Sequence, residues 1–250
     1  MNPEMGTGQS AFLARVRAAL ARTSGPRSAP REPDAYVDFT GRAEGIRAEA
    51  KRRWEELLPQ FAAELEAVGG MMHRAVSSAV PVLVSRIAKE RGFNRIAVWS
   101  EAALGLPGLQ DALWAEGLEV ADGSPSSDGP TTPEMIGDFR RQLDRAEIGL
   151  TGVDYAIADS GSLVLLTGAG KGRLVSCLPI VHVAILRPGE LVGSLDEVGV
   201  FLEALHRSSA PVDTPSGIIF ITGPSRTADI ELSLTRGVHG PREVHVIALS

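Results

Sequence analysis

The apolar residues of this chain recur at two spacings that replace one another along the sequence. Apolar positions three and four residues apart, typical of helices, alternate with short apolar runs typical of strands. The helical stretches cover residues 45–68, 79–91, 110–116 and 135–143, and the strand-like runs cover 71–76, 95–99 and 118–121. Helices placed between strands in this way predict parallel βαβ units, and hence a Rossmann-like layered α/β sheet with flanking helices.

Punctuating residues set the limits of these elements. Pro59 predicts a break or kink inside the first helix, and Gly69-Gly70 predicts its end. Further strands are expected at 153–158, 162–167, 180–186, 218–221 and 243–249. A capping box of Ser194 and Glu197 predicts a helix that ends near His206.

A polar and apolar alternation lies between two Gly-Pro pairs near the end of the sequence. Its polar members are Asp229, Glu231, Ser233 and Thr235, and its apolar members are Ile230, Leu232 and Leu234. This period of two predicts a strand with one buried side, although the apolar residues at 230 and 234 would also suit one helical turn.

The first 33 residues are expected to form a separate extension. Residues 10–22 have the pattern of an amphipathic helix, with Phe12, Leu13, Val16 and Leu20 on one face, and 25–33 is a proline-containing linker. We therefore divide the chain into 1–33 and a main domain at 34–250. The run at 122–133 is predicted to be a surface loop.

Composition narrows the classes of function. A net charge of −6 argues against a general binder of nucleic acid or anionic membranes. The single cysteine, Cys177, cannot by itself supply the ligands of an iron–sulfur cluster or a structural zinc site, so we expect no metal in this chain. Without a membrane-spanning run or a signal peptide, a cytoplasmic location is expected.

Two turns carry polar groups that could bind an anion. The glycine-rich loop at 168–173 contains Lys171 and Arg173, but it lacks the spacing of a Walker A or a dinucleotide motif. An anion site and a solvated turn both remain open for this loop. Asp159 and Ser160 follow a predicted strand, where ligand groups often lie, although turns use the same residue types.

The stretch from 218 to 249 gathers the remaining candidates. Its Gly-Pro turns present ligand-binding candidates Gly223, Ser225, Arg226, Thr227 and Gly240, with Asp229, Glu231 and His239 as candidate catalytic groups. The alternative is a structural network in which Arg226 and Arg236 pair with the two carboxylates. His182 and His245 lie in strand runs, which favours packed imidazoles, and Cys177 has the apolar neighbours of an ordinary buried thiol.

These motifs resemble a known family. The sequence GPSRTADIE at 223–231, followed by GVHGP at 237–241, looks like the signature of the LUD domain, as in lactate utilization protein C. The upstream sequences ADSGSL at 158–163 and GRLVS at 172–176 are similar to further family elements. The resemblance spans roughly residues 151–249.

The resemblance implies a fold of the NagB/RpiA/CoA-transferase kind. It also implies a role as the cluster-free subunit of a complex that oxidises L-lactate to pyruvate, with iron–sulfur clusters on two partner subunits. It supplies no independent catalytic centre, so whether this chain is itself an enzyme stays open. The alternative is a free-standing enzyme or ligand-binding module for a phosphorylated, folate-like or CoA-like ligand.

Overall fold

A computed structural model describes residues 13–15, 18, 37–123, 132–207, 215–228, 234–237 and 239–250. The chain divides into two units, Met1–Asp38 and Phe39–Ser250. In the first unit, residues 13–15 and 18 are helical, within the predicted amphipathic helix. The rest of that helix and the linker at 25–33 lie outside the described residues. The strands of the described chain all belong to the second unit.

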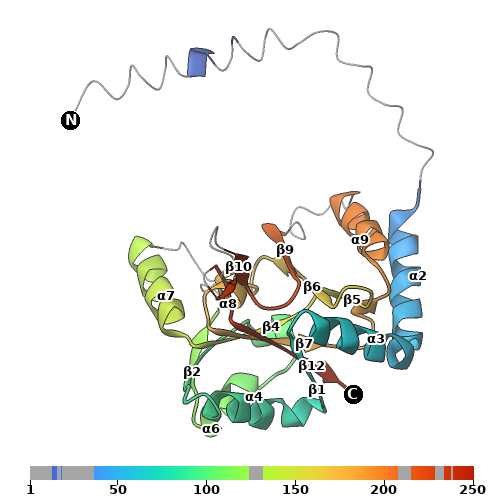
Figure 1. The fold of residues 1–250 in the computed structure, drawn as a ribbon. Coiled ribbons are helices and arrows are strands. Elements are labelled where there is room, and N and C mark those ends of the chain that lie inside the picture. Colours follow the sequence, from blue (N-terminus) through green and yellow to red (C-terminus); the bar gives the residue numbers. More distant parts are fainter. Residues whose placement is uncertain are drawn as a thin grey trace. The chain divides into compact units, whose positions relative to one another are not determined.

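A six-stranded sheet lies at the centre of the second unit (Figure 1). Every ladder in it is parallel, in the order β1-β12-β7-β4-β2-β3. Its strands are β1 (Met71–Ala75), β2 (Arg95–Val98), β3 (Glu119–Asp122), β4 (Ile148–Gly152), β7 (Val181–Leu186) and β12 (Glu243–Leu249). This sheet confirms the predicted layered α/β class.

Helices precede β1 and occupy the connections between these strands. They are α3 (Trp54–Ala67), α4 (Val80–Lys89, after the 3₁₀ turn η1 at Ser77–Ala79), α5 (Glu101–Leu104), α6 (Leu109–Ala115), α7 (Pro133–Arg145) and α8 (Leu174–Cys177). Figure 1 shows α4 and α6 on one side of the parallel sheet and a smaller sheet on the other. The central strands are therefore covered on both faces, as parallel strands require.

The smaller sheet was not anticipated from the sequence, although most of its strands were. It contains β5 (Tyr155–Ile157), β6 (Ser162–Thr167), β8 (Leu191–Val192) and β9 (Gly217–Ile221), in the order β8-β5-β6-β9. Leu163 and Leu165 point into the core shared with the parallel sheet, whereas Val164 lies in a second core against α2 (Phe39–Arg52) and α9 (Leu195–Arg207). Because successive side chains of β6 point to opposite faces of the smaller sheet, each face of that sheet packs into its own core.

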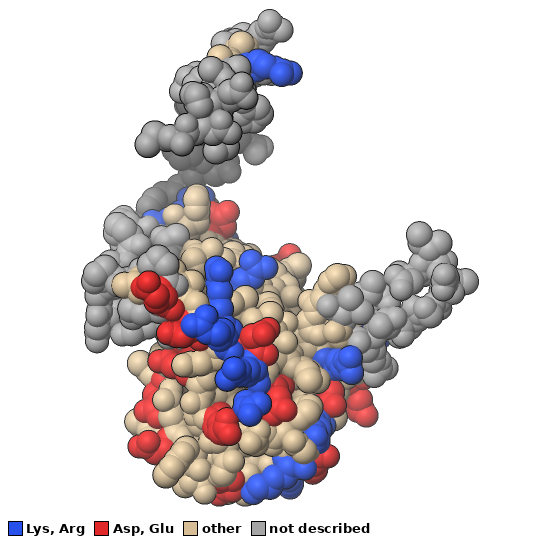
Figure 2. All heavy atoms as spheres, turned by 90° about the vertical axis from the view of Figure 1, so that its left-hand side faces the viewer, with Lys and Arg blue, Asp and Glu red and all other residues tan. Residues whose placement is uncertain are grey.

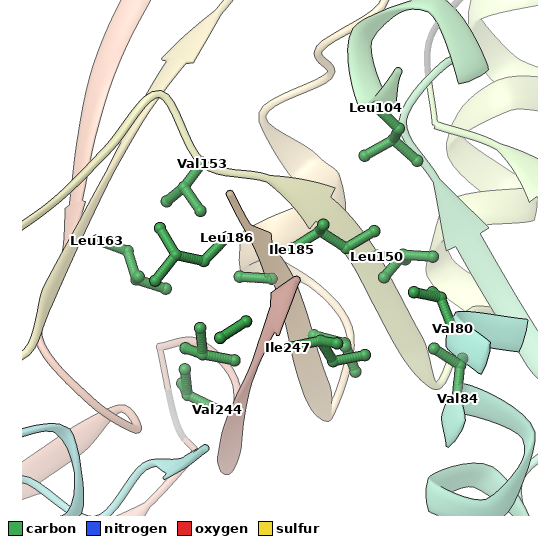
Figure 3. Packing of buried hydrophobic residues seen from close by; sticks show 14 of the residues in the cluster. Val80, Val84, Leu104, Leu150, Val153, Leu163, Ile185, Leu186, Val244 and Ile247 are labelled. Atoms are coloured by element: carbon green, nitrogen blue, oxygen red, sulfur yellow. The ribbon is translucent and has the colours of Figure 1, made fainter. Parts of the chain in front are cut away.

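Close packing between α4 and the parallel sheet is visible in Figure 3. Val80 and Val84 of α4 lie near Leu150 and Ile247, and all four side chains are fully buried. Burial of an aliphatic side chain of this size stabilises the fold by about 1.5–3 kcal/mol. Many such residues together hold α4 on the sheet.

The central strand β4 was missed in the sequence because it contains two glycines. Gly149 is nevertheless required there: a Cβ at this position would lie 1.8 Å from the Val175 carbonyl oxygen. The short helix α8 therefore rests directly on the backbone of β4. A low strand propensity at this site is the consequence of close packing.

The break in the first long helix lies at Arg53, not at Pro59 as predicted. α2 ends at Arg52 and α3 begins at Trp54, so Pro59 lies inside α3. An interior proline costs about 3 kcal/mol. The buried face of α3 offsets that cost; its members are Trp54, Leu57, Leu58, Phe61 and Leu65.

Two further expectations near the end of the chain had different outcomes. The strand expected at 229–235 lies mostly outside the described residues, because 229–233 are not described; on either side of them, β10 (Arg226–Ala228) and β11 (Leu234–Arg236) pair antiparallel. The predicted capping box is confirmed at Glu197. Glu197 Oε2 accepts hydrogen bonds from the backbone N–H of Gly193 (2.6 Å) and Ser194 (3.4 Å).

Candidate functional site

A charged cavity opens at the carboxyl ends of β2, β4 and β7. Its volume is about 520 Å³. Its lining residues are Arg47, Ala48, Lys51, Trp99, Ala103, Gly152, Val153, Asp154, Lys171, Arg187, Pro188, Gly189 and Glu190. Ligands of α/β sheets bind at this edge, so we take this cavity as the candidate site.

Each wall of the cavity comes from a different part of the chain. Trp99 follows β2 directly, Asp154 lies just after β4, and the turn 187–190 connects β7 to β8. Arg47 and Lys51 belong to α2 and line the cavity from that helix. Because parallel strands end at one edge, the fold brings these groups together from residues 140 positions apart.

Lys171 of the glycine-rich loop is fixed in this cavity by two contacts. Its Nζ lies 2.5 Å from Asp154 Oδ1 and 5.6 Å from the centroid of the Trp99 ring. The backbone N–H of Leu166 donates to Asp154 Oδ2 at 2.8 Å, and Trp99 Nε1 donates to the Gly172 carbonyl at 3.0 Å. The loop is thereby held over the strand ends.

Arg187 and Glu190 form a second ion pair in the cavity, with a longer contact than that between Lys171 and Asp154. The backbone N–H of Arg187 donates to Glu190 Oε2 at 2.7 Å, while Arg187 Nη1 reaches Glu190 Oε1 only at 3.4 Å. Burial raises the pKa of Glu190 to about 7, despite the opposing hydrogen bonds and charge of Arg187. Within the described residues, the buried Arg187 Nη2 has no hydrogen-bond partner.

The balance of charge in the cavity is positive. Four basic side chains face two acidic ones among the lining residues. Arg47 donates to the Tyr155 hydroxyl at 3.0 Å, and Lys51 is exposed on α2. A net excess of two positive charges suits an anionic ligand.

The signature residues form a different cluster, at the carboxyl end of α3. Arg226 Nη2 donates a hydrogen bond to the Val68 carbonyl, and a Cβ on Gly223 would lie 2.7 Å from the same oxygen. The Ser225 backbone N–H donates to the Pro241 carbonyl at 2.8 Å. The backbone N–H of Arg242 donates to the Ile180 carbonyl at 2.8 Å, which places this cluster beside the amino ends of β7 and β12.

The turn that carries Asp159 and Ser160 meets the same end of α3. A Cβ on Gly161 would lie 2.4 Å from the backbone N of Leu65. Ser160 donates to Ser162 Oγ at 3.0 Å, and Ser162 lies 2.7 Å from Thr222 Oγ1. The two family motifs are therefore neighbours, but none of their described residues lines the cavity.

The remaining sequence candidates separate in space. Arg173 is exposed and lines a second cavity of about 390 Å³ beside β9, so it does not act with Lys171. His239 is exposed, and a Cβ on Gly240 would lie 3.3 Å from the Ser225 Cβ. Asp229, Glu231 and the side chain of Thr227 lie outside the described residues.

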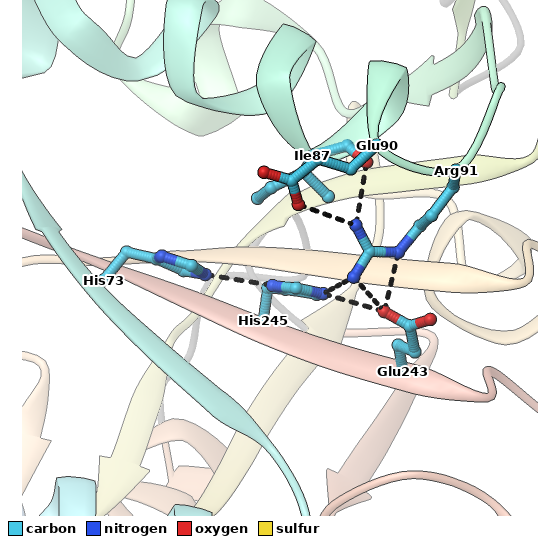
Figure 4. A network of polar contacts seen from close by, with 6 residues as sticks. All are labelled: His73, Ile87, Glu90, Arg91, Glu243 and His245. Atoms are coloured by element: carbon cyan, nitrogen blue, oxygen red, sulfur yellow. Dashed lines mark hydrogen bonds and ion pairs between the residues drawn. The ribbon is translucent and has the colours of Figure 1, made fainter.

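Three histidines, His73, His182 and His245, lie on the neighbouring strands β1, β7 and β12. Figure 4 shows that His73 and His245 share a hydrogen bond, 2.9 Å between Nε2 and Nδ1, and that His245 lies 3.2 Å from Glu243. Arg91 Nε donates to Glu243 at 2.7 Å. The neighbouring His182 is fully buried, which lowers its pKa to about 3. His182 Nε2 lies 2.8 Å from Thr151 Oγ1, whereas its buried Nδ1 has no hydrogen-bond partner among the described residues. The predicted packed, hydrogen-bonded role is therefore confirmed for His245, and for one ring nitrogen of His182.

Sequence reasoning found Lys171 but missed the rest of the cavity. Arg47, Lys51, Asp154, Arg187 and Glu190 stand in no recognised motif. The usable signal was position: Arg187 comes directly after a predicted strand, and a polar residue there often reaches the ligand crevice. Asp154 could not be found in this way because β4 itself was missed.

Figure 2 shows the side that carries α7, β2 and α6, where a stripe of basic side chains has acidic ones on both sides. Arg95 of β2 pairs with Glu119 of β3 (3.1 Å), and Arg141 pairs with Asp138 within α7. The described residues contain no helix long and apolar enough to cross a membrane. Nor do they contain a group of three or more His, Cys, Asp or Glu arranged to hold a metal ion.

Comparison with known proteins gives consistent results. Lactate utilization protein C of Halalkalibacterium halodurans is 36% identical over 159 residues, covering 63% of this chain and 64% of the relative. The protein of that name from Geobacillus is 39% identical over 114 residues, 44% of this chain and 46% of the relative. These alignments thus span less than two thirds of either relative. Uncharacterized protein YkgG of Escherichia coli is 29% identical over 231 residues, 92% of this chain and 93% of that protein.

A crystal structure of a DUF162 family protein from Deinococcus radiodurans is also similar. It shares 23% sequence identity and a TM-score of 0.48, covering 78% of this chain and 98% of that protein. The model of the LUD domain matches residues 58–249, which include the cavity strands and both signature motifs. The chain therefore belongs to the LUD domain family.

Proposed function

We propose that this protein is the cluster-free subunit of a complex that oxidises L-lactate to pyruvate, with iron–sulfur clusters on partner subunits. The names of its relatives support a role in lactate utilization. The single cysteine supports the placement of the clusters elsewhere. In this proposal the charged cavity binds the organic anion.

The observation that carries the proposal is the excess of basic groups at the carboxyl edge of the parallel sheet. Arginine and lysine bind carboxylates through charge-assisted hydrogen bonds, which are stronger than neutral ones. Arg187 Nη2 is buried and unpartnered among the described residues, and so has capacity for one more acceptor. The carboxylate oxygens of a 2-hydroxy acid would fill it.

Lys51→Gln tests this assignment with a matched control on the same helix. Lys51 lines the cavity, whereas its neighbour Arg52 pairs with Glu49 and does not line it. We expect Lys51→Gln to weaken anion binding by about 1 kcal/mol, roughly a fivefold change in affinity. Arg52→Gln should leave it unchanged.

The measurement is lactate-dependent dye reduction by the chain reconstituted with its cysteine-rich partners. A higher lactate concentration for half-maximal rate in Lys51→Gln alone supports the proposal. Equal curves for both variants would move the ligand away from this cavity. Activity of the partners without this chain would remove it from the complex altogether.

A second candidate is a module for a phosphorylated, folate-like or CoA-like ligand. The cavity volume favours it, because about 520 Å³ lies within the roughly 300–1,000 Å³ of pockets for larger ligands. Thermal stabilisation of the isolated chain by coenzyme A or by a folate, but not by lactate, would support this alternative.

A further inference from the structure

The two carboxylates of the charged cavity, Asp154 and Glu190, differ in the hydrogen bonds that they accept. Each oxygen of Asp154 accepts a short hydrogen bond, one from Lys171 Nζ at 2.5 Å and one from the backbone N–H of Leu166 at 2.8 Å. Glu190 has one short hydrogen bond, from the backbone N–H of Arg187, and a long contact to the Arg187 guanidinium. An acid with so few partners in a confined space is the easier one to protonate.

We infer that the cavity takes up its anion together with a proton, and that Glu190 carries this proton. The inference rests on the proposed anion site and adds the regulation of that site. Glu190 is an acidic partner of Arg187, with 3.4 Å between Oε1 and Nη1. An incoming carboxylate or tetrahedral anion would compete for the same guanidinium.

The backbone of Glu190 is fixed, so the carboxylate can move away from such a ligand only by side-chain rotation. Its carbonyl accepts a hydrogen bond of 2.7 Å from the Ala156 backbone N–H. Its side chain is only 22% exposed, so solvent screens it weakly. Two negative groups would then compete for one cation in a poorly solvated space, and protonation of Glu190 removes the conflict.

Charged groups from every neighbouring element face this part of the cavity. Arg187 belongs to the same turn, Arg47 and Lys51 to α2, Lys171 to the glycine-rich loop, and Asp154 to the end of β4. Arg187 favours the ionised form of Glu190, and Asp154 opposes it. A bound anion offsets the cations, so it shifts the balance toward the protonated form.

This arrangement makes the two binding events cooperative. Burial places the pKa of Glu190 at about 7 in the empty cavity, so about half of the molecules carry the proton at pH 7. Anion binding would then take up about half a proton at that pH. Above pH 7 the affinity should fall by as much as about tenfold per pH unit.

The test is isothermal titration calorimetry of the full chain, with L-lactate and sulfate as separate probes. Neither probe titrates between pH 6 and pH 8.5, so proton exchange can be assigned to the protein. The heat of binding is measured in two buffers of different ionisation enthalpy. The difference in binding heat, divided by the difference in buffer ionisation enthalpy, gives the number of protons taken up. We expect about half a proton at pH 7.

Glu190→Gln removes the titrating group and keeps an oxygen that can accept from the Arg187 backbone. This variant should bind the same probe without buffer dependence and with an affinity that does not change with pH. Glu119→Gln is the control, because Glu119 lies on the edge strand β3, outside the cavity, where it pairs with Arg95 of β2. It should behave like the unaltered protein.

The outcomes separate this inference from the proposal beneath it. Binding by the unaltered protein without proton uptake overturns the role of Glu190 and leaves the anion site in place. Uptake that persists in Glu190→Gln also overturns it. If neither probe binds at millimolar concentration, the anion site itself is wrong and the inference falls with it.

Discussion

The two edges of the parallel sheet are built from polar residues in opposite ways. At the carboxyl edge, Arg187 and Glu190 are held loosely and face a cavity. At the amino edge, the signature loops bond to one another and to the end of α3, as Arg226 does to Val68. The difference indicates that the recognisable motifs of this chain include positions needed for folding, while the proposed anion site is lined mostly by residues without a motif.

The largest expected effect is at the amino edge, from Gly161→Ala. Gly161 has φ of 62°, and a Cβ there would lie 2.4 Å from the backbone of α3. Backbone on backbone cannot yield easily, so we expect a loss of about 3 kcal/mol or more in the free energy of unfolding. Urea denaturation measures it.

Gly168→Ala is the matched control, because a Cβ on Gly168 would meet nothing within 4 Å. This substitution should change stability by less than about 1 kcal/mol. Similar losses in both variants would mean that the close packing of the turn at 159–161 against α3 does not explain the need for Gly161.

The carboxyl edge should respond to alkali through Glu190. Folding raises the pKa of Glu190 from 4.5 to about 7, so the folded protein loses stability as the pH rises through that range. Glu190→Gln should therefore be more stable than the unaltered protein by about 3 kcal/mol at pH 8, with the difference much reduced at pH 5. Denaturation midpoints at the two pH values give the comparison, and a constant difference would contradict it.

The amino edge should respond to acid instead, through His182. Folding lowers the pKa of this buried imidazole from 6.5 to about 3, so the unfolded chain takes up the proton first. Stability should fall by about 1.4 kcal/mol per pH unit from this group as the pH drops below 6.5. His182→Gln should flatten the acid limb of the stability profile, and an unchanged slope would exclude this histidine as its source.

The smallest effect expected is that of Arg226→Ala. Arg226 is exposed and donates to the last turn of α3, so its loss should cost about 1 kcal/mol of stability. Anion binding at the cavity should not change. If Arg226→Ala abolished lactate oxidation while stability stayed normal, the functional site would lie at the amino edge rather than the carboxyl edge.

The elements with strong periodicity could be predicted from the sequence, and those shaped by packing could not. β12 was found to the residue because Val244, Val246 and Ala248 alternate with their neighbours. β4 was missed because Gly149 serves the approach of α8, which lies 26 residues further along the chain. No local pattern records such a contact.

The same limit applies to the candidate site. Lys171 was found because it lies in a visible glycine-rich loop, but its partner Asp154 belongs to the end of the unrecognised strand. Arg47 and Lys51 have the pattern of ordinary solvated helix residues, and only the position of α2 brings them to the cavity. Convergence of distant segments is a property of the fold, which single-sequence patterns do not contain.

The place of β12 in the sheet has a consequence for synthesis. β12 lies between β1 and β7, and in the described chain it is the strand that pairs with β1. On the ribosome, residues 71–75 must therefore wait until residues 243–249 have emerged before they gain a neighbour. Once β7 has formed, its edge also stays unfilled until β12 emerges, and a chaperone that shields this edge would act during that interval.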